Sequence, residues 1–263
     1  MDAGVTGPPG RRGREEVVNA IRRLVAGEPR SRFALDLGDV SRAEADAAVE
    51  EAWGWDPRRP RAAIDTDHTL EAARTLGERL RAVAAGGGRV ALATGRPASL
   101  LPMLVRLGAS AAAQGASVVE LVRYGPLEPP RHPGRWLWWH EGVAVVSDGE
   151  RLLPDETAET GSEWLFAVGR PDLVVADHAF AGAAATSGSE TFALADLDAP
   201  ALAVAAHRGV PVHLVPLDDR CPPAAYAPLV DVILATPSED QQQHSTTRVV
   251  ETYAPADCGG KKG

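Results

Sequence analysis

The chain has 263 residues, and its 27 Lys+Arg against 36 Asp+Glu give a formal net charge of −9 at pH 7. This length suits one large α/β domain or two small ones and is sufficient for a sizeable core. The acidic balance argues against nucleic acid and anionic membranes as partners, because binding to phosphate backbones needs clustered positive charge. Both lysines, Lys261 and Lys262, lie near the C-terminus, so a cationic role at a site falls to arginine.

The cysteines and the hydropathy pattern give no sign of secretion or membrane insertion. Cys221 and Cys258 lie in a proline-rich turn and near the C-terminus, and they predict neither a disulfide framework nor a metal site. No segment approaches the ~18 apolar residues of a membrane span. The N-terminal residues are rich in Gly, Pro and Arg and lack the apolar stretch of a signal peptide. We therefore expect a cytoplasmic protein.

Composition divides the chain into three parts. Residues 1–13 are expected to be disordered, and so is the Ser-, Gln- and Gly-rich tail of residues 236–263. Residues 14–235 are expected to form a single α/β catalytic domain that begins with a mostly helical section, residues 14–86.

Three helices are predicted in that section from their apolar spacing: Glu15–Ala26, a second near Ala43–Trp53, and a third that starts at Asp67 or Thr69 and reaches Val83. Ser41-Arg-Ala-Glu44 has the spacing of a capping box for the second helix. Gly86-Gly-Gly88 ends the third.

The rest of the domain alternates between short apolar runs and helical segments. Predicted strands are Arg89–Thr94, Ser117–Val122, 173–176, 191–195, 210–217 and Val230–Leu234, and predicted helices are Leu100–Leu107, 179–187 and 199–208. Alternation on both sides of Glu141-Gly142 predicts a β-hairpin. Runs of Val, Leu and Ala between helices are typical of parallel strands buried on both faces. We therefore predict a three-layer α/β sandwich with a mainly parallel, Rossmann-like sheet, a helical N-terminal section and an inserted β-hairpin.

Four of the apolar runs stop at small polar clusters. These are Thr94-Gly95-Arg96, Asp177-His178, Asp196-Leu-Asp198 and Asp218-Asp219-Arg220. In parallel sheets ligands bind beyond the carboxyl ends of the strands. The four clusters are therefore expected to share one ligand site.

The first cluster has the features of an anion site. Gly95 lets the backbone approach a ligand, and Pro97 suits the first position of a helix. The free N–H groups of that helix start, with Thr94, Arg96 and Ser99, can hold a phosphate. The alternative is an ordinary strand-to-helix turn in which Ser99 is the cap.

The second cluster offers a proton-transfer group. Asp177 can cap the following helix and do nothing else, which is the commonest role of Asp at such a position. His178 titrates near neutral pH, and the small residues after it let the helix lie close to the sheet. We predict Asp177 and His178 as catalytic residues.

The remaining clusters supply carboxylates for a metal. Asp196 ends its strand and is a predicted ligand, whereas Asp198 before Ala-Pro is interpreted as a helix cap. Asp177, Asp196 and Asp218 are the predicted metal ligands, and Asp148 is a further candidate. Such crowding of carboxylates requires a cation, and oxygen ligands favour Mg²⁺ or Mn²⁺ over zinc.

Arg220 is a predicted phosphate-binding residue, but the Asp218-Asp219-Arg220 cluster has two readings. It either recognises substrate or forms a structural salt bridge.

Two family resemblances bear on function. Asp65-Thr-Asp67-His-Thr69 matches the DxDxT motif of haloacid-dehalogenase-type phosphatases, but the segment before Asp65 is a poor buried strand and no lysine exists for that family's third motif.

The chain is more similar to a little-studied family of GC-rich bacterial proteins labelled phosphatase, some with a histidinol-phosphate phosphatase label. The matching stretches are Ala93–Leu101, Leu137–Gly149, Pro171–Ala184 and Val215–Tyr226. Where that family has Gly after Asp-His and Asn after Asp-Asp, this chain has Ala179 and Arg220. The resemblance implies a phosphatase without assigning catalytic residues.

Three functions remain open at this point. The leading hypothesis is a metal-dependent phosphatase that hydrolyses a phosphomonoester of a small metabolite. The alternatives are a lyase or cyclase acting on a small carboxylate substrate, and a non-catalytic metabolite-binding protein. The sequence does not predict the oligomeric state.

Overall fold

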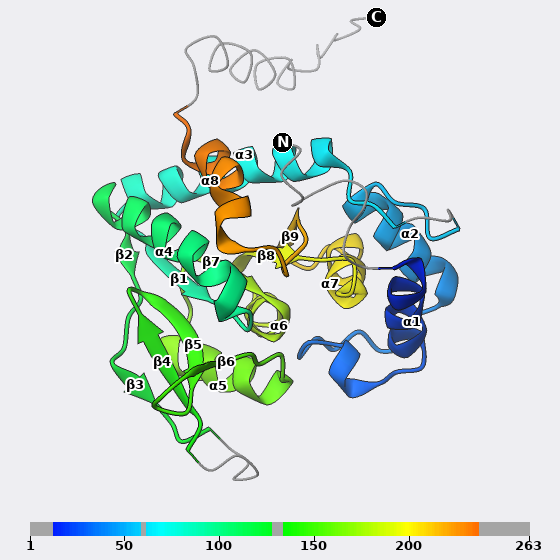
Figure 1. Ribbon diagram of the computed structural model, residues 1–263, viewed down its shortest axis with the longest axis horizontal. Coiled ribbons are helices and arrows are strands. Elements are labelled where there is room, and N and C mark those ends of the chain that lie inside the picture. The colour runs from blue at the N-terminus through cyan, green and yellow to red at the C-terminus, as the bar shows by residue number, and fades with distance from the viewer. Residues whose placement is uncertain (1–12, 59–61, 128–133, 237–263) are drawn as a thin grey trace, which may run out of the picture.

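The computed structural model describes residues 13–58, 62–127 and 134–236. Within these ranges the chain forms a nine-stranded mixed sheet with eight α-helices (Figure 1). Apart from Gly13 and Thr236, the two predicted disordered termini lie outside the described residues. The α/β class predicted from the sequence is confirmed.

Five parallel strands form the centre of the sheet. They are β1 (Arg89–Ala93), β5 (Val143–Ser147), β7 (Leu173–Asp177), β8 (Glu190–Ala195) and β9 (Val212–Pro216). Their spatial order is β5-β1-β7-β8-β9, so the chain reverses its direction of progress across the sheet between β1 and β7. Such a reversal is the topological switch point of a doubly wound sheet, where ligands bind.

The other side of the sheet is partly antiparallel, so the prediction of a mainly parallel sheet is only partly correct. The strands here are β3 (Arg123–Tyr124), β4 (Trp136–His140) and β6 (Leu152–Leu153). The predicted hairpin joins β4 to β5, and Glu141 and Gly142 both have positive φ, as its tight turn requires. The predicted strand Ser117–Val122 is reduced to β2 (Ser117–Val118), which pairs with β1.

Helices cover both faces of the sheet and give three layers. α3 (Thr66–Ala85), α4 (Pro97–Ala113) and α8 (Ala227–Leu234) pack on the face to which Val90 and Leu92 point. α5 (Ala158–Val168), α6 (His178–Thr186) and α7 (Pro200–His207) pack on the opposite face, together with Ala91 and Ala93. Successive side chains of a strand point to opposite faces, so each apolar run contributes to both cores.

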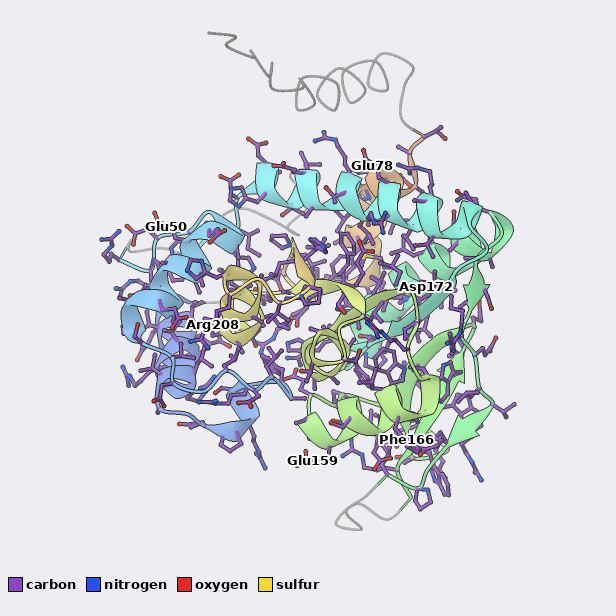
Figure 2. All side chains as sticks on the ribbon, turned by 180° about the vertical axis from the view of Figure 1, so that it is seen from behind. Glu50, Glu78, Glu159, Phe166, Asp172 and Arg208 are labelled. Atoms are coloured by element: carbon purple, nitrogen blue, oxygen red, sulfur yellow. The ribbon has the colours of Figure 1, made fainter. Side chains whose placement is uncertain are left out.

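The N-terminal section lies beyond α7 (Figure 1). It contains α1 (Arg14–Val25), the short 3₁₀ helix η1 (Pro29–Ser31) and α2 (Arg42–Trp53). The predicted cap at Ser41 is present, since its side chain accepts a hydrogen bond from Glu44 N at 3.1 Å. Arg208, at the end of α7, pairs with Glu44 and joins the section to the sandwich (Figure 2).

One predicted helix start was late by a residue and one predicted strand was wrong. α3 begins at Thr66, one residue before the earlier of its two predicted starts, and Asp65 caps it by accepting from Asp67 N at 2.9 Å. The predicted strand Val230–Leu234 is part of helix α8. Its buried residues Leu229, Val230 and Ile233 fit one face of a helix, and a short apolar run does not by itself distinguish the two structures.

Among the helices of the described residues, none combines the length and the apolar character needed to cross a bilayer.

Candidate active site

The polar clusters at the carboxyl ends of four neighbouring strands lie together. Thr94 follows β1, Asp177 ends β7, Asp196 follows β8, and Asp218 and Asp219 follow β9. All five side chains are buried. The apolar strands therefore bring acidic groups from distant parts of the chain to one edge of the sheet.

Asp177 connects β7 to β1 at the switch point. Its Oδ2 accepts a hydrogen bond from Thr94 Oγ1 at 2.7 Å, and its Oδ1 accepts one from Gly95 N at 2.7 Å. Asp177 occupies the cap position of α6, but its side chain makes no capping hydrogen bond there. The carboxylate therefore orders the turn that follows β1.

The donors predicted to bind phosphate are engaged by protein groups. Arg96 N donates to Thr94 Oγ1 at 2.8 Å, and Ser99 Oγ donates to the main-chain oxygen of Asp219. A side chain at Gly95 is excluded by packing, because a Cβ there would collide with the main-chain carbonyl of Asp155.

Glu156 is a site residue that sequence reasoning missed. It lies in the loop between β6 and α5, and this loop is held against β1 by a hydrogen bond from Asp155 N to Gly95 O at 3.1 Å. Its carboxylate forms an ion pair with Arg96, and its Oε1 lies 3.9 Å from His178 Nε2. No local signal marks Glu156, because its neighbours form an ordinary helix start.

His178 lies at the centre of the acidic groups and is only 1% exposed. Its Nε2 lies 3.3 Å from Asp219 Oδ2 and 3.8 Å from Asp198 Oδ1. Burial of the imidazole lowers its pKa, but the surrounding carboxylates, Asp177 first among them, outweigh burial and raise the pKa well above its usual value. The ring of Phe33 covers His178 edge-on, with centroids 5.3 Å apart.

Two groups of side chains within the described residues have the geometry to hold a metal ion. One is Asp196, Asp218 and Asp219, and the other is His178, Asp198 and Asp219. In each group the ligand atoms lie within 4.8 Å of one another. The predicted ligands Asp196 and Asp218 are thus brought together, whereas Asp177 belongs to neither group.

The interpretation of Asp198 as a helix cap was wrong. The cap position of α7 is Ala199, and the carboxylate of Asp198 faces His178. Asp219, which the sequence left undecided, belongs to both groups of possible ligands.

Arg220 and Asp148 lie in different settings. Arg220 Nη1 is 3.4 Å from Glu16 Oε1 at a half-exposed position, and Arg220 N donates to Asp218 Oδ1 at 2.9 Å. Asp148 accepts main-chain hydrogen bonds from Glu150 and Arg151, which lower its pKa and place it in a surface turn.

Several carboxylates gather around one guanidinium and one imidazole in this site. Arg96 pairs with Glu156 and Asp219, and His178 Nε2 lies within 3.9 Å of carboxylate oxygens of Glu156, Asp198 and Asp219. Burial opposes the charge on Arg96, but Asp219 and Glu156 outweigh it, and the pKa of Arg96 is raised. The oxygen atoms grouped here are of the kind that can hold a divalent ion.

The dehalogenase-type motif is not part of this site. Asp65 and Asp67 are exposed at the start of α3, and no strand precedes them in the part of the chain that the structure describes. Thr69 Oγ1 donates to the main-chain oxygen of Pro216 at 2.7 Å, which is a structural contact.

The fold and this edge of the sheet define an α/β protein with a buried cluster of acidic side chains at its switch point. The profile of the Phosphatase family matches residues 1–240. A protein of Streptomyces coelicolor named Phosphatase SCO2771 is 33% identical over 233 residues, which cover 84% of this chain and 87% of that protein. No solved structure matches the chain significantly.

The chain belongs to the Phosphatase family. This membership confirms the predicted family and the predicted class of enzyme, a hydrolase of phosphate esters.

Proposed function

We propose that the protein is a metal-dependent phosphatase that hydrolyses a phosphomonoester of a small metabolite. The observation that carries the proposal is the buried group of Asp196, Asp218 and Asp219 beside the guanidinium of Arg96. Carboxylates and an arginine at one strand edge are the parts that phosphoryl transfer requires, since the reaction depends on charge stabilisation.

The donor set fits a hard divalent cation. Asp196, Asp218 and Asp219 offer oxygen atoms only, which Mg²⁺ and Mn²⁺ prefer. Asp218 Oδ2 is buried and makes no hydrogen bond with any described residue, so one ligand atom is available. A bound cation would supply Lewis acidity and a more acidic water at this edge of the sheet.

Arg96 is the proposed phosphate-binding residue. Its side chain is 21% exposed, whereas the carboxylate of Asp219 that lies 3.4 Å from its Nε is fully buried. A phosphate that reaches the acidic group from solvent would therefore meet the guanidinium. In the reaction a water oxygen bonds to phosphorus, the ester P–O bond breaks, and the departing oxygen takes a proton to become an alcohol.

Asp177 is proposed to position the turn that carries Arg96, because both of its oxygens accept hydrogen bonds from that turn. Its role as a metal ligand stays a prediction, and so do the contacts of Thr94, Ser99 and Arg220 with phosphate. His178 can either transfer a proton or serve as a nitrogen ligand. The number of bound cations distinguishes the two roles.

The test is phosphate release from a panel of sugar, amino-alcohol and nucleoside phosphates with Mg²⁺ or Mn²⁺, with and without a chelator. We expect turnover that the chelator abolishes, and loss of turnover in D218N. The matched control is D231N, since Asp231 is an exposed aspartate that pairs only at the surface with Arg106. Turnover that survives complete removal of metal would overturn the metal dependence.

The same panel addresses the other functions. Binding without release of phosphate would favour a metabolite-binding protein, and conversion of a carboxylate substrate without phosphate release would favour a lyase or cyclase. A cytoplasmic location and the lack of nucleic-acid and membrane partners stay predictions.

A further inference from the structure

We propose that the site holds two divalent cations that share the carboxylate of Asp219. This inference rests on the proposed function and deepens it, since it assigns a second cation position and a new role to His178. It follows from the two groups of side chains, which have Asp219 in common.

The two positions differ in ligand chemistry. Asp196, Asp218 and Asp219 form an all-oxygen position suited to Mg²⁺ or Mn²⁺. His178, Asp198 and Asp219 add a nitrogen, and imidazole suits transition-metal ions such as Fe²⁺ or Zn²⁺. Mn²⁺ takes the carboxylate ligands that both positions offer and is therefore the probe of choice.

Unused ligand atoms support each position independently. At the first position, Asp218 is 4% exposed and its Oδ2 makes no hydrogen bond with the described residues. At the second, His178 is 1% exposed, and neither ring nitrogen makes a hydrogen bond within the described chain. The distances of 3.8 and 3.9 Å from its nitrogens to Asp198 and Asp177 are too long for hydrogen bonds, and Asp219 Oδ2 at 3.3 Å from Nε2 makes an ion-pair contact without a hydrogen bond.

A pair of cations suits the proposed chemistry. In two-metal phosphatase sites the ions lie about 3.5–4 Å apart and together stabilise the attacking and leaving oxygens. In this chain Asp219 sets their separation, and Ser99 fixes the backbone of Asp219 by donating to its main-chain oxygen. Arg96, with Nε at 3.4 Å from Asp219 Oδ2, is placed to bind the phosphate beside the pair.

The test measures Mn²⁺ stoichiometry by equilibrium dialysis of the full chain, and the spin coupling of bound Mn²⁺ by electron paramagnetic resonance. We expect two ions per chain with a coupled spectrum. D198N should retain one ion with an uncoupled spectrum, and D218N should also retain one. D219N should lose the coupled pair, whereas the surface control D231N should bind two.

A second variant of the nitrogen position is H178N. Its residue has φ near +41°, which Asn tolerates better than most residues, so the backbone is preserved. Circular dichroism and thermal unfolding identify any variant that fails to fold. The stoichiometry and spectrum of the wild-type chain test the proposal without any substitution.

The outcomes separate this inference from the proposed function. One Mn²⁺ per chain, with an uncoupled spectrum and metal-dependent phosphate release, would overturn the pair and leave the phosphatase proposal intact. No bound Mn²⁺ together with chelator-resistant turnover would overturn both. Two coupled ions without phosphatase activity would support the pair and contradict the proposed function.

Discussion

The substitution G95A tests why a glycine follows β1. A Cβ at this position would lie 3.0 Å from the carbonyl carbon of Asp155 and closer still to its oxygen. The backbone of Gly95 is not in the left-handed region, so the collision is the only obstacle to alanine. Either the turn or the loop that carries Glu156 must move.

The magnitude follows from the contacts that this movement disturbs. Forcing an extra methyl into a packed region costs about 1–3 kcal/mol. Displacing Asp155 also weakens its hydrogen bond to Gly95 O, which contributes about 0.5–1.5 kcal/mol. We therefore expect the free energy of unfolding to fall by about 1.5–4.5 kcal/mol. Because Glu156 pairs with Arg96, the rate of phosphate release should fall as well.

Urea unfolding followed by tryptophan fluorescence measures the change in stability, and phosphate release measures activity. The control is G86A, because a Cβ at Gly86 meets nothing closer than 3.6 Å and φ is −83°. That variant should be neutral or more stable by up to about 1 kcal/mol. If G95A unfolds within about 0.5 kcal/mol of the parent chain, the packing argument is refuted. A raised KM at unchanged stability would instead indicate that the glycine serves the approach of a ligand.

Four further predictions concern single carboxylates. D177N should lower the free energy of unfolding by about 1–3 kcal/mol in urea titrations and abolish turnover. The two carboxylate oxygens of Asp177 accept hydrogen bonds from Thr94 Oγ1 and Gly95 N, and the NH₂ group of Asn would face one of these donors instead. In the presence of a chelator, the free energy of unfolding of D218N should exceed that of the parent by about 0.5–2 kcal/mol, because the substitution removes one of several crowded charges. A lower urea midpoint than that of the parent would contradict the idea that the cluster opposes folding. E190Q should lose about 0.5–1 kcal/mol at pH 7 and progressively less as the pH falls through the lowered pKa of Glu190. Arg79 lowers this pKa, so the ion pair stabilises the fold fully above the unfolded pKa and is lost in acid; a loss that does not change with pH would exclude the ion pair as its cause. D67N should leave phosphate release unchanged, and its inactivation would restore the dehalogenase-type interpretation.

The strand ends were predictable because burial on both faces leaves a clear mark in the sequence. Val, Leu and Ala runs gave the positions of β1, β7 and β8 within a residue or two, and with them the places of Thr94 and Asp177. The hairpin at Glu141-Gly142 was predictable for a similar reason, since its flanking strands alternate.

The partners of those side chains were not predictable from local pattern. Glu156 reaches the site only because Asp155 packs against Gly95, a contact between residues 60 positions apart in the chain. Asp198 resembles a helix cap, and only the actual start of α7 at Pro200 shows that it is not one. Which of Asp218 and Asp219 is central depends on how the chain leaves β9, and the sequence around them does not specify this.

Asp219 lies where these unpredicted contacts meet, and its surroundings explain why the acidic group can persist in a folded chain. Its carboxylate faces Arg96 and His178, while its main-chain oxygen accepts from Ser99 at the start of α4. The same residue thus joins β9 to the turn after β1 and to the end of β7. A buried cluster of carboxylates weakens the fold, and natural proteins tolerate such local cost mainly at functional sites. The contacts that hold Asp219 in place therefore favour a ligand site over an accident of packing.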